Sequence, residues 1–173
     1  MTNSLLWLNP VPSDTILLIM ADRRFVYDHP RPAVTVDVVC CRYSDGRGQV
    51  ALVRRAREPF AGAWALPGGF VNIGEDISDA ARRELAEETG LKPIWIEQFY
   101  CFGTPGRDPR GRTISVAYVA RVDPTQTGRA ADDAAQLRWF DMEDLPTLAF
   151  DHDRIIKKAR PALADWQKLG RIE

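Results

Sequence analysis

Three glutamates, Glu84, Glu87 and Glu88, are spaced so that they would lie close together on one face of a helix. The segment 77–89 predicts such a helix, because its apolar residues recur at helical spacing. The side expected to face a core carries aliphatic and small residues: Ile77, Ala80, Ala81 and Leu85. The glutamates continue the same stripe, so the helix presents carboxylates where an ordinary amphipathic helix presents methyl groups.

Such a carboxylate cluster needs a neutralising partner. Carboxylates three or four residues apart repel one another, and partial burial raises the cost unless protons or a cation neutralise them. Oxygen-only ligands select Mg²⁺ or Mn²⁺. The alternative is a solvated acidic patch paired with Arg82 and Arg83. The residues of the helix alone leave both interpretations open.

A longer pattern surrounds the cluster, from Gly69 to Leu91. Gly69 is followed after five residues by Glu75 and, seven residues later, by Arg-Glu-Leu-Ala-Glu-Glu-Thr-Gly-Leu. This segment resembles the box of the Nudix hydrolases, with every fixed position filled, and the flanking pattern fits that family from about Val34 to Phe140. The resemblance implies an α/β fold: an α/β/α sandwich with a mixed β-sheet and a catalytic loop–helix–loop.

The resemblance also implies an activity and roles for individual residues. It implies hydrolysis of a nucleoside diphosphate linked to another group, with Mg²⁺ as cofactor and Mn²⁺ as its substitute. The three glutamates would be the metal ligands, joined by a backbone carbonyl at Gly68. Arg83 would orient a glutamate through charge-assisted hydrogen bonds, and Glu75 would brace the loop. The attacking water would lose its proton to a box glutamate or to a later loop acid, with Asp132 and Asp133 as the nearest candidates and solvated acids as the alternative.

Substrate-binding candidates lie outside the box. Pro105 follows the box at a distance that resembles the ADP-ribose pyrophosphatase branch, although a proline is also an ordinary turn residue. The same loop carries Arg107 and Arg110, whose guanidinium groups suit phosphates. Of the arginines that follow the second predicted strand, Arg55 is the candidate for a terminal phosphate. Ordinary solvated charge is the alternative for all three arginines.

The function that we expect is hydrolysis of ADP-ribose to AMP and ribose 5-phosphate. One alternative is a nucleoside triphosphate pyrophosphohydrolase that cleans the nucleotide pool. Another is an ADP-ribose-sensing module without turnover. The complete set of glutamates argues against a pure sensor, because a sensor has no need of three carboxylates that repel one another.

Composition limits the partners. The chain has 173 residues, with 23 Lys and Arg against 24 Asp and Glu. It lacks the basic excess that is typical of a nucleic-acid or acidic-membrane binder, so we expect a small-molecule nucleotide as the partner. Its apolar segments are too short to span a membrane. Three cysteines without a CxxC pair predict free thiols in a reducing cytoplasm.

The pattern along the chain predicts an N-terminal arm, 1–33, and a Nudix hydrolase domain, 34–173. In the arm, 14–27 predicts a helix or a pair of strands. The apolar residues of the arm predict a homodimer, with coverage of the chain's own sheet edge as the alternative. In the domain we expect a helix over 77–89, a last helix capped by Asp151 and kinked or split at Pro161, and strands over 34–43, 49–54, 64–66, 94–102, 113–122 and 137–140.

Overall fold

The computed structural model describes residues 27–44, 46–130 and 134–169. The chain forms two compact units, Met1–Arg31 and Pro32–Glu173. In the described part of the first unit, the Arg31 guanidinium lies 4.0 Å from the centroid of the Tyr27 ring. The helix or strand pair expected over 14–27 lies outside the described residues, except for Tyr27.

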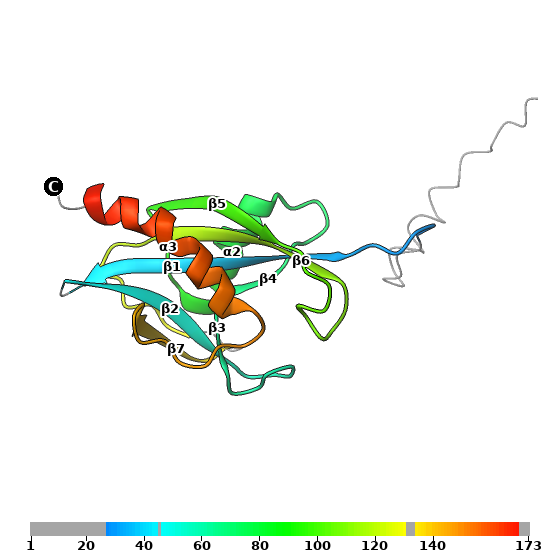
Figure 1. Ribbon diagram of the computed structural model, residues 1–173, viewed down its shortest axis with the longest axis horizontal. Helices are drawn as coiled ribbons and strands as arrows, with labels where there is room; N and C mark the ends of the chain where they lie inside the picture. Colours follow the sequence, from blue (N-terminus) through cyan, green and yellow to red (C-terminus); the bar gives the residue numbers. More distant parts are fainter. Residues whose placement is uncertain (1–26, 45, 131–133, 170–173) are drawn as a thin grey trace, which may run out of the picture. The chain divides into compact units, whose positions relative to one another are not determined.

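The second unit is built on a mixed sheet (Figure 1). The strand order is β3-β2-β1-β6-β5, with β4 paired to β1 and β7 paired to β2. β1 and β6 are parallel, and the other pairs are antiparallel. The strands are β1 Ala33–Ser44, β2 Arg47–Arg55, β3 Trp64–Ala65, β4 Gly68–Phe70, β5 Trp95–Phe102, β6 Thr113–Arg121 and β7 Ala134–Asp141.

Two helices, α2 Ile77–Thr89 and α3 His152–Leu169, cover opposite faces of this sheet. Alternation along β1 shows the division, because Val36, Val38 and Cys40 pack with α2 whereas Val39 and Cys41 pack with α3. The result is the α/β/α sandwich that the sequence predicts. Neither described helix has the length and apolar character needed to cross a membrane.

The predicted helix 77–89 is confirmed at both ends. Of the two effects expected of Pro161, a kink or a split in the last helix, the split is wrong. α3 continues through Pro161 to Leu169. A proline removes one backbone hydrogen bond, but buried Ile155, Ala159 and Leu163 hold the helix against the sheet on both sides of it. β4 was not predicted: the strand expected over 64–66 is followed by a Gly-Gly-Phe segment that itself pairs with β1.

Candidate active site

Local sequence fixes both ends of α2. Asp76 is the N-cap, and its Oδ1 accepts a hydrogen bond from the Ser78 amide at 2.8 Å. Gly90 takes the left-handed conformation at the C-terminus, with φ of 67°, and its amide donates to Ala86 O at 2.8 Å. The helix therefore cannot shift in register, which fixes where the glutamates lie.

The buried face of α2 differs in part from the predicted face. Ala80, Ala81 and Leu85 are buried as expected, but Ile77 is 37% exposed. Side chains on a helix tilt toward its N-terminus, so that of the first residue projects past the helix end. Glu84 and Glu88 continue the buried stripe toward β4, whereas the Glu87 side chain is 61% exposed.

Glu88 reaches the backbone of β4. The Gly68 amide donates to Glu88 Oε2 at 3.0 Å. Burial, together with the negative charges of Glu84 and Asp37, raises the pKa of Glu88 from 4.5 to about 7, although the Gly68 hydrogen bond and Arg55 oppose the shift. The site therefore holds a carboxylate at a place where its charge is poorly solvated.

Glu84 packs against the next residue of β4. A Cβ atom at Gly69 would lie 2.5 Å from the Glu84 carboxylate oxygens, so only glycine leaves room for this side chain. Burial raises the pKa of Glu84, and the Arg83 guanidinium opposes that effect. The two glycines of β4 thus form a backbone wall against which Glu84 and Glu88 lie.

Arg83 organises the carboxylates on the outer side of the site. Its Nε donates to Glu75 Oε1 at 2.6 Å, and its Nη1 donates to Glu84 at 2.7 Å and Glu87 at 3.0 Å. Glu75 also accepts from the Asn72 amide at 2.9 Å. The bonds from Arg83 lower the pKa of Glu75 to about 2. This geometry supports an orienting role for Arg83 and a bracing role for Glu75.

The donor set fits a hard divalent cation. No three acidic, histidine or cysteine side chains of the described residues already stand as a metal-binding cluster. Glu84 nevertheless raises the pKa of Glu88, and Glu87 raises that of Glu84, so a cation beside this wall without side chains would relieve their repulsion. Alternation of the β1–β4 hydrogen bonds turns the Gly68 carbonyl away from β1, so it is available as a further oxygen ligand.

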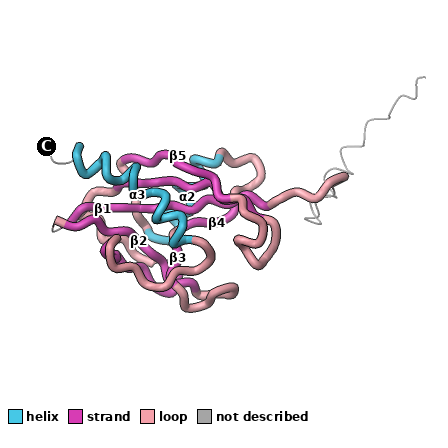
Figure 2. The backbone as a smooth tube through the Cα atoms, viewed as in Figure 1, coloured by secondary structure: helices cyan, strands magenta, loops and turns pink. Residues whose placement is uncertain are grey.

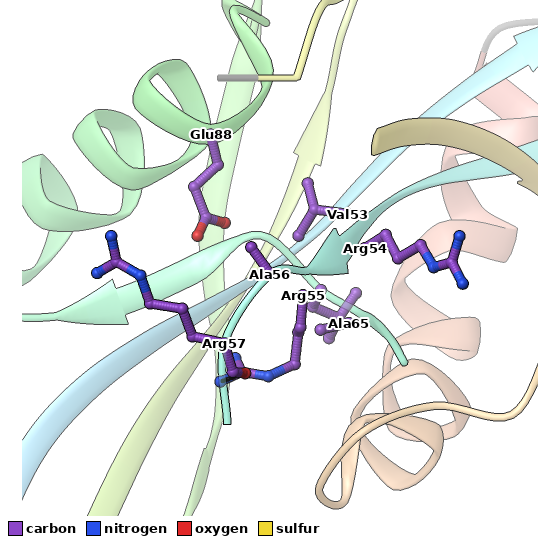
Figure 3. Close-up of a pocket in the computed structure, with 8 residues that line it drawn as sticks. Val53, Arg54, Arg55, Ala56, Arg57, Ala65 and Glu88 are labelled. Carbon is purple, nitrogen blue, oxygen red and sulfur yellow. Dashed lines mark hydrogen bonds between the residues drawn. The ribbon is translucent and has the colours of Figure 1, made fainter. Parts of the chain in front are cut away.

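A cavity of about 150 Å³ opens beside Glu88. Arg55 and Arg57, at the end of β2 and just after it, line the same cavity, and Figure 3 shows Arg54 pointing away from Glu88. Burial and the nearby Arg110 lower the pKa of Arg55, which shows that two cations share this region. Negative charge from a ligand would relieve their repulsion.

The loop between β5 and β6, pink in Figure 2, divides its residues between two environments. Arg110 pairs with Asp108 at 2.7 Å and lies 5.0 Å from the centroid of the Phe70 ring and 5.4 Å from that of the Phe150 ring, over which Arg55 also lies. Arg107 is only 5% exposed and bonds to Asp151 at 2.6 Å. The structure therefore places Arg107 beneath the surface, although the sequence suggested it as a substrate-binding residue. Pro105 is exposed in the same loop.

Asp37 and His152 complete a buried polar network that the sequence reasoning missed. Asp37 Oδ2 accepts from the Ser115 hydroxyl at 2.5 Å, and its Oδ1 lies 3.4 Å from His152 Nε2. His152 Nδ1 accepts from the Leu66 amide at 2.9 Å, and burial lowers the pKa of His152. The network ties α3 and β6 to the segment before β4. The one acidic residue in an apolar predicted strand was a signal that could have revealed Asp37.

One expectation is wrong, and another falls outside the described residues. The Asp151 carboxylate was expected to cap α3, but it bonds to Arg107 at 3.1 and 2.6 Å, while the backbone carbonyl of Asp151 accepts from the first turn. The loop acids Asp132 and Asp133 lie outside the described residues.

Comparison with known proteins gives one consistent result. The NUDIX domain model matches residues 32–159. An ADP-ribose pyrophosphatase of Methanocaldococcus jannaschii is 42% identical over 126 residues, which are 73% of this chain and 72% of that protein. The NUDIX domain of Shewanella oneidensis NrtR, solved with ADP ribose, superposes with a TM-score of 0.74 at 33% identity, covering 85% of this chain and 97% of that one.

A transcriptional repressor is also similar. The ADPR responsive repressor NtrR of Acinetobacter baylyi is 33% identical over 136 residues, which are 76% of this chain. The chain spans 54% of that repressor's length.

Proposed function

Because the chain belongs to the NUDIX family, we propose that this Nudix hydrolase, which acts on pyrophosphate bonds, cleaves ADP-ribose to AMP and ribose 5-phosphate with Mg²⁺. One observation carries the proposal: Glu88 lies at a cavity that Arg55 also lines, so a carboxylate able to hold a metal faces a cation able to hold a phosphate. The names of the similar proteins support ADP-ribose as the ligand.

Each residue of the site has a role in this proposal. Glu84, Glu87 and Glu88, with the Gly68 carbonyl, hold the metal, which supplies charge neutralisation and a lower pKa for a bound water. Arg83 fixes the glutamates through its bonds to Glu84 and Glu87, and Glu75 holds Arg83 in place. Arg55 and Arg110 bind the phosphate groups of the substrate, and Arg107 holds the loop of Arg110 and Pro105 against α3.

A substrate panel tests the proposal. ADP-ribose, other nucleoside diphosphate sugars and nucleoside triphosphates are incubated with the protein and Mg²⁺ or Mn²⁺, and the products are separated by chromatography. We expect AMP and ribose 5-phosphate in equal amounts from ADP-ribose. Release of pyrophosphate from triphosphates, at a higher kcat/KM than for ADP-ribose, would identify the nucleotide-pool alternative. Tight binding of ADP-ribose without products would identify a sensor.

Metal binding has a readout that does not depend on turnover. Mg²⁺ and Mn²⁺ are expected to raise the Tm with increasing concentration, because only the folded state brings the carboxylates together. At one hundred times the Kd the gain is about 2.7 kcal/mol. The gain should disappear when Glu84, Glu87 and Glu88 are all replaced by alanine. A wild-type Tm that neither metal changes would contradict the assignment.

The proposal includes a homodimer and a cytoplasmic location, both of which stay predictions. The described cysteines are free, which suits a reducing compartment. Light scattering on the full chain, and on a chain that starts at Arg31, tests the dimer and the contribution of the arm. A full chain that stays monomeric at micromolar concentration would contradict the dimer.

A further inference from the structure

Two phenylalanines of the described chain have a left-handed backbone. Phe60 has a φ of 65° and Phe150 a φ of 53°, and all the other described residues with positive φ are glycines. This conformation is unfavourable for a bulky side chain. The two residues belong to different loops, yet their rings meet edge to face with centroids 4.8 Å apart. Both unfavourable positions therefore lie at one place.

The loop between β2 and β3 holds Phe60 rigidly. Arg55 N donates to Ala63 O at 2.9 Å, and Gly62 N donates back to Arg55 O at 2.8 Å. Inside this closed loop, Arg55 Nε donates to Pro59 O at 2.8 Å, and Ala63 N donates to Phe60 O at 3.1 Å. The backbone on both sides of Phe60 is thus fixed, so the direction of its side chain is set by the loop.

Phe150 is fixed from the other side. Ala149 N donates to Trp64 O at 2.8 Å, which ties the segment before α3 to β3. The ring of Phe150 lies 5.3 Å from the ring of His152, tilted by 30°. Because His152 is itself held in the buried network, Phe150 forms a firm support for Phe60.

The fold does not account for this arrangement. Phe60 is 43% exposed, and neither Phe60 nor Phe150 belongs to either of the two core clusters. A strained backbone that presents an aromatic ring to solvent gains little from burial, and such strain is characteristic of functional positions. The exposed part of the Phe60 ring is accessible to a flat ligand.

The neighbouring charges indicate what kind of flat ligand. The Arg55 and Arg110 guanidinium carbons lie 4.9 and 5.4 Å from the centroid of the Phe150 ring. Arg55 also lines the cavity of Glu88. Moving away from Glu88, a ligand would therefore meet a cation and then an aromatic surface. A nucleotide has the matching order, with phosphate next to ribose and an aromatic base beyond.

We propose that Phe60 is the stacking platform for the purine base of the substrate and that Phe150 is its positioning residue. This inference rests on the proposed function, because it takes the substrate to be a nucleotide whose phosphates lie at Arg55 and Arg110. It adds the surface that distinguishes a nucleotide from other phosphate esters.

Calorimetric titration with two probes tests the platform. AMP and ribose 5-phosphate carry the same phosphate and pentose, but only AMP has a base. In the presence of Mg²⁺, wild-type protein should bind AMP more tightly than ribose 5-phosphate. Phe60→Leu should weaken AMP about tenfold, in the range of a lost base–aromatic stack, and leave ribose 5-phosphate unchanged. Phe60→Tyr, which keeps a ring, should retain the preference.

The Tyr100–Phe102 pair supplies a matched control. Its rings also meet edge to face, with centroids 5.0 Å apart, and Lys158 lies over Tyr100. Tyr100→Leu should change neither affinity. If Phe60→Leu melts early, Phe60→Gly removes the ring and accepts the left-handed backbone, and the same loss is expected. If Phe60→Leu weakens the binding of AMP and of ribose 5-phosphate equally, or does not weaken the binding of AMP, the inference is overturned. Absence of ADP-ribose hydrolysis by the wild type would instead contradict the proposed function.

Discussion

Glu88→Gln is expected to lower kcat with ADP-ribose at saturating Mg²⁺ by about 100-fold or more, which is ~2.7 kcal/mol in the barrier. The amide keeps an oxygen that can accept from the Gly68 amide, so the local hydrogen bond survives. It lacks the negative charge that holds a metal. Glu87→Gln should have a similar effect, although Glu87 is the more exposed of the two. Steady-state kinetics over a range of Mg²⁺ concentrations measures both variants.

The same substitution should stabilise the metal-free protein at high pH. The folded state raises the pKa of Glu88 from 4.5 to about 7. The contribution of Glu88 to the free energy of unfolding is therefore fully present below pH 4.5 and is lost as the pH rises through 7. Glu88→Gln has no carboxyl group to ionise and so avoids this loss. Its free energy of unfolding should therefore exceed that of the wild type by an amount that grows to about 3 kcal/mol at pH 8. His152, with its lowered pKa, acts in the opposite direction but equally in both proteins.

Glu97→Gln, on the exposed side of β5, is the matched control and should change neither kcat nor the pH profile of stability. Glu88→Gln activity above about a tenth of wild type at saturating metal, a difference below ~1.4 kcal/mol, would show that Glu88 is not a metal ligand. If the difference in unfolding free energy between Glu88→Gln and the wild type does not depend on pH, the pKa of Glu88 is not raised in the folded protein.

The two glycines of β4 should respond to alanine in opposite ways. At Gly68 a Cβ would lie 2.1 Å from the Val36 carbonyl oxygen, a backbone atom of the central strand that cannot move aside. Gly68→Ala should therefore cost about 3 kcal/mol or more in unfolding free energy. At Gly69 the Cβ would meet the carboxylate of Glu84, which can rotate away. Gly69→Ala should keep its Tm within a few degrees and lose about 10- to 100-fold in activity.

Gly103→Ala serves as the control for both variants, because a Cβ there meets only side-chain atoms at 3.8 and 3.9 Å. Thermal melts and kcat measurements on the three variants separate the effects. A fully active Gly69→Ala enzyme would show that the position of Glu84 against β4 does not matter. A Gly68→Ala protein with wild-type Tm would contradict the close approach to β1.

Local patterns predicted most of the fold. Helix α2 was predicted from the helical spacing of its apolar residues, and the structure adds the caps Asp76 and Gly90 that fix its two ends. The strands β1, β2, β5 and β6 follow from runs of β-branched and aromatic residues. β4 escaped prediction because two of its three residues are glycines, which carry no strand signal and pair with β1 only through tertiary contact.

The site was predictable where one segment carries it, and less so where distant segments meet. The roles of Glu75 and Arg83 were placed by the motif, and their hydrogen bonds support them. Local sequence did not distinguish the buried Arg107 from the other arginines of its loop, because its partner Asp151 is far away in the sequence. The meeting of Phe60 and Phe150 likewise depends on the pairing of the Leu148 segment with β3, which no local pattern predicts.

The parallel pairing of β1 with β6 has a consequence for biosynthesis. β1 pairs with β6 from Ala33 to Cys41, so one edge of an apolar central strand stays open until Arg121 has left the ribosome. α2 is made within that interval, before Val116 and Ala120 are available to complete its core. The segment bearing the glutamates is therefore synthesised early but gains its final position late. Closure of this long-range pair is expected to limit the folding rate, and the nascent chain is most prone to aggregate before it forms.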